Sequence, residues 1–118
     1  MTEIVTFTNQ AAQGDMLITR IDSIPADATP ITPENGYYVL AHSETGHNHV
    51  TIARPETRFF QDAKDAMTSY LQVLSVDTLF EHQRLFDTHK TLTPSRPGTF
   101  KITRQREATS EGWRKSQD

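Results

Sequence analysis

The 118-residue sequence contains no cysteine. Without thiols the chain cannot form disulfides or thiolate metal sites, so any metal must be bound by imidazole, carboxylate and water. The start, MTEIVTFTNQ, lacks the basic and apolar regions of a signal peptide, and no run approaches the roughly 20 apolar residues of a membrane span. We therefore expect a protein that is not secreted by a standard signal and does not enter a membrane.

Excess positive charge is also lacking. The chain has 12 Lys and Arg against 15 Asp and Glu, a net charge of -3, so a nucleic-acid partner is not expected. No glycine-rich phosphate loop and no nucleophile elbow appears, which leaves hydrolase and nucleotidase functions without support. Hydrophobic residues make up 35% of the chain, as in a globular protein, and the length fits one domain.

Short apolar, β-branched and aromatic segments separated by turn-forming residues predict strands. The segments are GDMLITRID, GYYVLAHS, HVTIA, RFFQD and RPGTFKITRQRE, and the loops between them include SIPADATPITPENG and LTPSRPG. We expect a mainly β protein, a small single-domain β-sandwich or barrel-like fold with extended terminal arms. The expected parts are an N-terminal arm at 1–12, a β-rich domain at 13–107 and a C-terminal arm at 108–118.

Residues 62–74 fit two patterns. Helical spacing is shown by Ala63, Ala66, Met67, Tyr70, Leu71 and Leu74. In contrast, SYLQVLSV alternates as a strand does after the turn-like QDAKDA. The strand interpretation is preferred and the helix stays open. The alternation in all segments predicts a core made of Leu17, Tyr38, Leu40, Val50, Ile52, Phe60, Leu71, Val73, Phe100 and Ile102.

The stretch HSETGHNHV, residues 42–50, carries three histidines around one glycine. A three-residue turn at Glu44-Thr45-Gly46 suits this stretch, because Gly46 can adopt the left-handed conformation without strain. That turn pairs Ala41 with His49 and places His47 and His49 on one face of a strand, with His42 on the other. Two imidazoles are then available to one ion.

A metal site needs a third ligand, for which His82, His89 and Glu56 are the candidates. Together with His47 and His49 such a set would bind zinc, iron or manganese. The Gly-His-x-His strand is similar to the cupin pattern, although Glu56 lies further along the chain than the cupin carboxylate and no histidine follows the final Pro-Gly turn. The default interpretation remains that these histidines are polar groups on an exposed hairpin or at a subunit contact.

QGDMLITRIDSIP, GHNHV and PGTFKITRQRE together resemble a family of small uncharacterised proteins of bacteria and tailed phages, over about residues 13–107. Members of that family carry the Gly-His-x-His hairpin and a second histidine pair before the final Pro-Gly turn. In this chain His82 and His89 are spread apart by QRLFDT, which is a departure from the pattern. The resemblance implies an architecture and a histidine pattern and no activity.

The C-terminal tail, ATSEGWRKSQD, has one large apolar side chain, Trp113, followed by Arg114 and Lys115. We interpret these three residues as a partner-binding set, with Trp113 as the anchor and the two cations meeting an acidic protein surface. We expect a non-enzymatic structural protein, such as a capsid decoration or cement protein bound to the major capsid protein, found in the virion or the host cytoplasm. This function needs no cofactor; the alternative is a cupin-like metal-binding protein or metalloenzyme that uses His47 and His49.

Overall fold

Strands form throughout the part of the chain that the computed structural model describes, which is residues 4–41, 48–75, 78–82, 91–104, 106–109 and 112–115, with backbone alone for 82, 106–109 and 112–115. The strands are β1 Ile4–Phe7, β2 Gln10–Gln13, β3 Met16–Ile21, β4 Thr29–Pro30, β5 Tyr37–Ala41, β6 His49–Ile52, β7 Thr57–Gln61, β8 Thr68–Val73, β9 Glu81–His82, β10 Thr91–Pro94, β11 Gly98–Arg104, β12 Arg106–Thr109 and β13 Gly112–Lys115. Within these ranges there is no helix, and so none that could cross a membrane. The prediction of a small, mainly β protein is confirmed.

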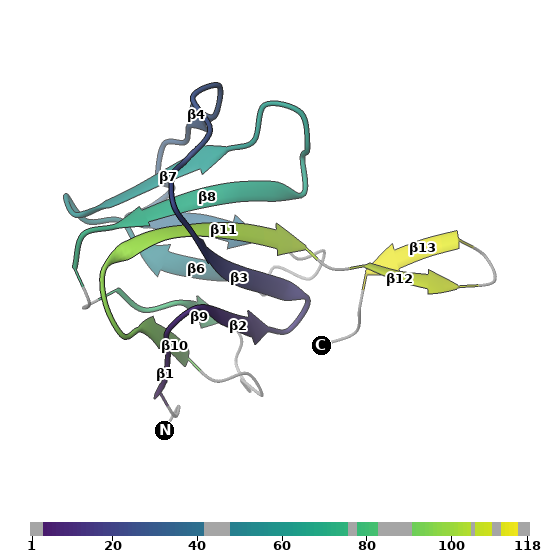
Figure 1. Cartoon of the computed structure of the whole chain (residues 1–118), viewed down its shortest axis with the longest axis horizontal. Helices are drawn as coiled ribbons and strands as arrows, with labels where there is room; N and C mark the ends of the chain where they lie inside the picture. Colours follow the sequence, from purple (N-terminus) through teal and green to yellow (C-terminus); the bar gives the residue numbers. More distant parts are fainter. Residues whose placement is uncertain are drawn as a thin grey trace.

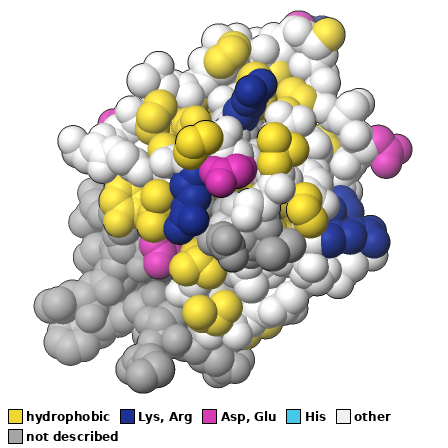
Figure 2. All heavy atoms as spheres, turned by 90° about the vertical axis from the view of Figure 1, so that its left-hand side faces the viewer, with side chains coloured by type: hydrophobic (Ala, Val, Ile, Leu, Met, Phe, Trp, Pro, Cys, Tyr) yellow, Lys and Arg dark blue, Asp and Glu magenta, His cyan; other side chains and the backbone are white. Residues whose placement is uncertain are grey.

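The largest sheet has the strand order β2-β3-β11-β8-β7-β4 and a second sheet has the order β5-β6-β9. Strand β1 pairs in parallel with β10, and β12 pairs with β13 in a hairpin that extends beyond the rest of the molecule, here called the body (Figure 1). Figure 2 shows the end of the body away from this hairpin. There, polar and charged groups separate the described hydrophobic side chains, and these form no continuous patch.

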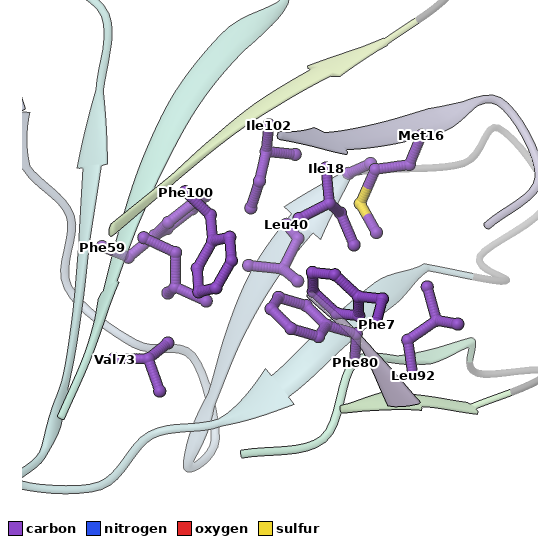
Figure 3. Packing of buried hydrophobic residues seen from close by; sticks show 12 residues of the cluster. Phe7, Met16, Ile18, Leu40, Phe59, Val73, Phe80, Leu92, Phe100 and Ile102 are labelled. Carbon is purple, nitrogen blue, oxygen red and sulfur yellow. The ribbon is translucent and has the colours of Figure 1, made fainter. Parts of the chain in front are cut away.

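The core lies between the sheets (Figure 3). Three phenylalanines form its centre: the ring of Phe7 lies 5.5 Å from that of Phe100 and 5.8 Å from that of Phe80. Leu40 reaches them from the smaller sheet, and Ile18 from the larger one. Of the ten residues predicted for the core, six are buried: Leu40, Val50, Leu71, Val73, Phe100 and Ile102. Tyr38 is half-buried and packs against them.

The remaining three core predictions are wrong. In β3 the inward side chains are Met16 and Ile18, not Leu17, and in β7 Phe59 is buried whereas Phe60 is only half-buried. Adjacent apolar residues leave the inward face of a strand ambiguous, because a one-residue shift exchanges the two faces. Ile52 ends β6 with 38% of its surface exposed.

The segment with two patterns contains strand β8, so the strand interpretation of Thr68–Val73 is confirmed. Carboxylates shape the connection that precedes it. Asp62 Oδ2 accepts hydrogen bonds from the backbone N–H groups of Lys64 and Asp65, and Asp62 Oδ1 accepts one of 2.6 Å from the hydroxyl of Tyr70. Asp65 accepts from the Met67 N–H and the Thr68 hydroxyl. Ala63 and Ala66, whose spacing is compatible with a helix, are exposed in this connection.

Both expected arms contain strands. The N-terminal segment supplies β1 and most of β2, and Phe7 within it belongs to the core, so residues 4–12 form part of the body. A β-branched run ending in an aromatic residue, IVTF, favours this outcome. At the other end, Arg106 pairs with Lys115, so the predicted boundary at residue 108 falls inside β12.

Candidate functional site

The Gln13-Gly14-Asp15 segment forms the tight turn between β2 and β3, in which Gln13 and Met16 are the last paired residues. Gly14 has a φ of 60°, a backbone conformation that glycine adopts without steric cost and that suits the first central position of a two-residue hairpin turn. The turn directs Gln13 and Asp15 inward, and both are buried. A glycine thus positions two polar side chains inside the protein.

Gln13 fixes the orientation of His49. The Gln13 side-chain N–H group donates a 2.9 Å hydrogen bond to the carbonyl oxygen of Phe80, which can only accept. Gln13 Oε1 must therefore face His49 Nδ1, which lies 2.8 Å away, and the imidazole must donate from Nδ1. The Nε2 atom of His49 consequently faces Asp15 Oδ1, at 3.7 Å.

Asp15 also forms an ion pair with Arg104 at the end of β11. Its Oδ2 accepts hydrogen bonds of 3.2 Å from Nε and 2.8 Å from Nη2 of Arg104, and the side chain of Asp15 is 5% exposed. The Arg104 backbone N–H donates to the carbonyl of Met67, which holds the strand end in place. Charge-assisted hydrogen bonds of this length are among the strongest in proteins.

Gln13, Asp15, His49 and Arg104 are called the buried polar cluster below. They come from the β2–β3 turn, from β6 in the smaller sheet and from β11 in the larger one. The cluster therefore joins the two sheets through polar contacts at one corner of the body. Chemically it offers an oriented imidazole beside a carboxylate that is already neutralised by a guanidinium.

Of the predicted metal ligands, His49 is buried in this cluster, and His82 lies opposite His49 in the β6–β9 register. The predicted pairing of Ala41 with His49 is confirmed, with a register irregularity between Val39 and Ala41. Glu56 is exposed. His42, His47, His89, the turn at 44–46 and the side chain of His82 lie outside the described residues.

No three His, Cys, Asp or Glu side chains among the described residues form a metal-binding group. The predicted partner-binding residues Trp113, Arg114 and Lys115 all lie on β13, where Trp113 is opposite Ala108 and Arg114 is opposite Glu107. The sequence interpretation overlooked Gln13, Asp15 and Arg104 as site residues. The family resemblance was the one pointer to them, since its segments QGD and PGTFKITRQRE contain all three residues.

Arg104 also borders a pocket of about 180 Å³. Leu40 and Ala41 from β5 form one wall, and Phe59 and Ser69 from the larger sheet form another. Typical ligand pockets enclose about 300–1,000 Å³, so this space suits a small molecule at most. The pocket has both polar and apolar walls, and its charged lining residues are Arg104 and Glu34.

A family model described as a domain of unknown function (DUF8820) matches residues 12–105, and the chain belongs to this family. The match includes the whole buried polar cluster and ends directly before β12. No curated protein and no solved structure matches the chain.

Proposed function

We propose that the protein is a non-enzymatic structural component of a protein assembly and that its C-terminal hairpin, β12–β13, is the arm that binds a partner. The observation that carries this proposal is the position of the hairpin, which extends from the body in Figure 1 and follows the last residue of the family match. The body, which is held together by its apolar core and by the buried polar cluster, then presents the hairpin as a separate binding element.

The hairpin has the chemistry of a binding element. A single two-stranded hairpin is marginally stable in water, so a surface that packs against it or extends it adds much of its stability. Strand β13 carries Trp113 and Arg114, residue types that dominate the binding energy of many protein interfaces. Lys115 adds a second cation on the same strand, which suits a partner with an acidic surface.

The resemblance to tailed-phage proteins supports a virion as the assembly. A capsid decoration or cement protein is small, repeats over a particle and needs an arm for the neighbouring subunit. These requirements fit a 118-residue β protein whose body carries a hairpin extension. The proposed partner is the major capsid protein.

Co-expression with the major capsid protein encoded in the same genome, followed by gradient sedimentation, tests this proposal. The wild-type chain should sediment with the particles, and Trp113→Ala should remain at the top of the gradient. Leu74→Ala is the matched control, because Leu74 is a large apolar residue of the body that is 58% exposed. A wild-type chain that never sediments with particles would refute the virion assignment.

Metal binding is a second candidate, favoured by the geometry around His49. Two ligands at about 2.1 Å from a tetrahedral ion lie about 3.4 Å apart, and His49 Nε2 and Asp15 Oδ1 are separated by 3.7 Å. Metal-bound histidines usually donate their second ring N–H to an oxygen, as His49 Nδ1 does to Gln13. His82, one of the candidate third ligands, lies opposite His49 in the β6–β9 register.

Titration of the metal-free protein with ZnCl₂, MnCl₂ or ferrous salt in a calorimeter tests this candidate. Saturable 1:1 binding that is lost in His49→Gln and in His82→Gln would support a cupin-like site, with His47 and His89 as the next ligands to replace. Asp22→Asn serves as the control, since Asp22 is an exposed carboxylate that is not among the candidate ligands. Binding unaffected by His49→Gln would refute a site at the buried polar cluster.

A further inference from the structure

We propose that the outer edge of β2 is the docking site for the C-terminal hairpin of a second copy of this chain. This inference rests on the proposed function, in which the hairpin is a binding arm. The neighbouring subunit that the arm engages is here a second copy of the chain, and the dimer formed in this way is the unit that would meet the major capsid protein. The contact would add a strand to the larger sheet, so that backbone hydrogen bonds provide much of the affinity.

The backbone of β2 has one side available for pairing. Among the described residues β2 is paired within a sheet only to β3, and the N–H of Arg20 donates to the carbonyl of Asn9 at 2.7 Å. Hydrogen-bonded and non-hydrogen-bonded pairs alternate in an antiparallel ladder, so Ala11 and Gln13 also bond toward β3. Gln10 and Ala12 then direct their N–H and C=O groups away from the sheet.

The two edges of the larger sheet differ in their protection. The far edge is β4, a two-residue strand that contains Pro30, and short strands with proline block the addition of another strand. The β2 edge has the sequence QAAQ, with no proline and no charge. It borders an open groove of about 590 Å³ that is lined by β1, β2 and Leu92 without a charged residue. A strand that entered this groove would bury no charged group of the body.

The hairpin of a second copy fits this edge in structure and charge. Within its own chain the hairpin is paired with no other described strand. Residues 106–115, which span the hairpin, carry three Arg and Lys and two Glu, a net charge of +1, whereas residues 1–104 carry 9 Lys and Arg and 12 Asp and Glu, a net charge of -3. Opposite net charges favour the encounter of the two partners.

The position of the hairpin also allows a closed dimer. In Figure 1 the β2–β3 turn and the hairpin lie at the same end of the body. A two-fold axis near this end would place each hairpin on the β2 edge of the other copy, and a two-fold interface of this kind closes on itself. The assembly unit would then be a dimer with reciprocally exchanged hairpins.

Sedimentation velocity with full-length variants tests the inference. Ala12→Pro removes an N–H that faces away from β3, so it should block docking while the sheet remains folded. Ala12→Lys is the second edge variant, used if the proline variant does not fold by circular dichroism. The double variant Glu107→Pro/Ala108→Pro removes two consecutive N–H groups of β12 and disrupts the hairpin without touching the body.

The wild-type chain should sediment as a dimer, and each variant alone as a monomer at the same concentration. A mixture of the Ala12 variant with the hairpin variant should form a heterodimer, because one copy supplies the hairpin and the other the intact edge. A monomeric wild type would overturn the inference. So would a hairpin variant that remains dimeric while the Ala12 variant does not, since β2 edges would then pair directly.

The outcome is separable from the virion experiment. If the wild type is monomeric and sediments with particles, the hairpin can still be the arm that binds the particle, but a second copy of the chain is not its partner. A dimer that depends on both the hairpin and Ala12, in a chain that never joins particles, supports the docking site and removes the virion assignment.

Discussion

The guanidinium carbon of Arg20 lies 4.7 Å from the centroid of the Phe100 ring, directly across the β3–β11 ladder. From this position Arg20 donates hydrogen bonds to three backbone carbonyls: Nε to Thr8 at 2.7 Å, Nη1 to Pro97 at 2.8 Å and Nη2 to Arg96 at 3.1 Å. One side chain thus connects the β1–β2 corner with the turn before β11. Burial, and to a smaller extent the charge of Arg96, lower the pKa of Arg20.

Arg20→Lys should destabilise the protein by about 1–3 kcal/mol, because an ammonium cannot reproduce the planar fork or its stacking on the ring. Urea unfolding measures the change, and Arg58→Lys on the exposed face of β7 is the control that should leave stability unaltered. Gly98→Ala should act on the same contact, since a Cβ at Gly98 would collide with Nη1 of Arg20. An additive effect of the two substitutions would contradict this coupling.

Phe100→Ala should cost about 3–5 kcal/mol in the free energy of unfolding, the range for a buried aromatic side chain. Phe100 is fully buried, with its ring 5.5 Å from that of Phe7 and 6.2 Å from that of Phe80. Phe60→Ala provides a matched comparison, because Phe60 is half-buried on β7. Equal losses for the two variants in urea unfolding would contradict the assignment of strand faces.

Sequence patterns succeeded where polar and apolar residues alternate. Phe100 and Ile102 are buried and Lys101 is exposed, as the alternation predicts. The pattern failed at Met16-Leu17-Ile18 and at Phe59-Phe60, where neighbouring residues are all apolar and composition cannot select a face. Packing against the opposite sheet makes that selection.

The polar site was harder to predict than the core. Gln13 and His49 are 36 positions apart, and the contact between them depends on how β2 and β6 are placed in two different sheets. No local pattern marks Gln13 as buried, since it ends a strand of the sequence QAAQ. The motifs identified the residue types, but only the strand register brings Asp15, His49 and Arg104 together.

Breaking the Asp15–Arg104 pair should be costly from either side. Asp15→Asn leaves the nearly buried Arg104 guanidinium without its counter-charge. Arg104→Met leaves the buried Asp15 carboxylate without its counter-charge. Each single substitution should lower the free energy of unfolding by about 3–5 kcal/mol. The double variant should lose less than the sum of the two, as measured by urea unfolding in a double-mutant cycle. Strict additivity would show that the two groups do not interact.

The turn between β7 and β8 should weaken in acid. Hydrogen bonds from Tyr70 and then from the backbone of Lys64 and Asp65 lower the pKa of Asp62, and the contact with Asp62 raises the pKa of Tyr70 to about 12. A carboxyl whose pKa is lower in the folded than in the unfolded protein stabilises the fold above its unfolded pKa, about 3.9, and loses that contribution as the pH falls through the folded pKa.

Asp62→Asn should therefore lower the melting temperature at pH 7, and the difference from wild type should shrink as the pH falls below about 3.9. Thermal unfolding followed by circular dichroism, at pH 7 and at a pH below about 3.9, checks this prediction. Tyr70→Phe is the partner variant, because it lacks the hydroxyl that donates to Asp62. A difference that stays constant with pH would mean that the charge of Asp62 contributes nothing to the turn.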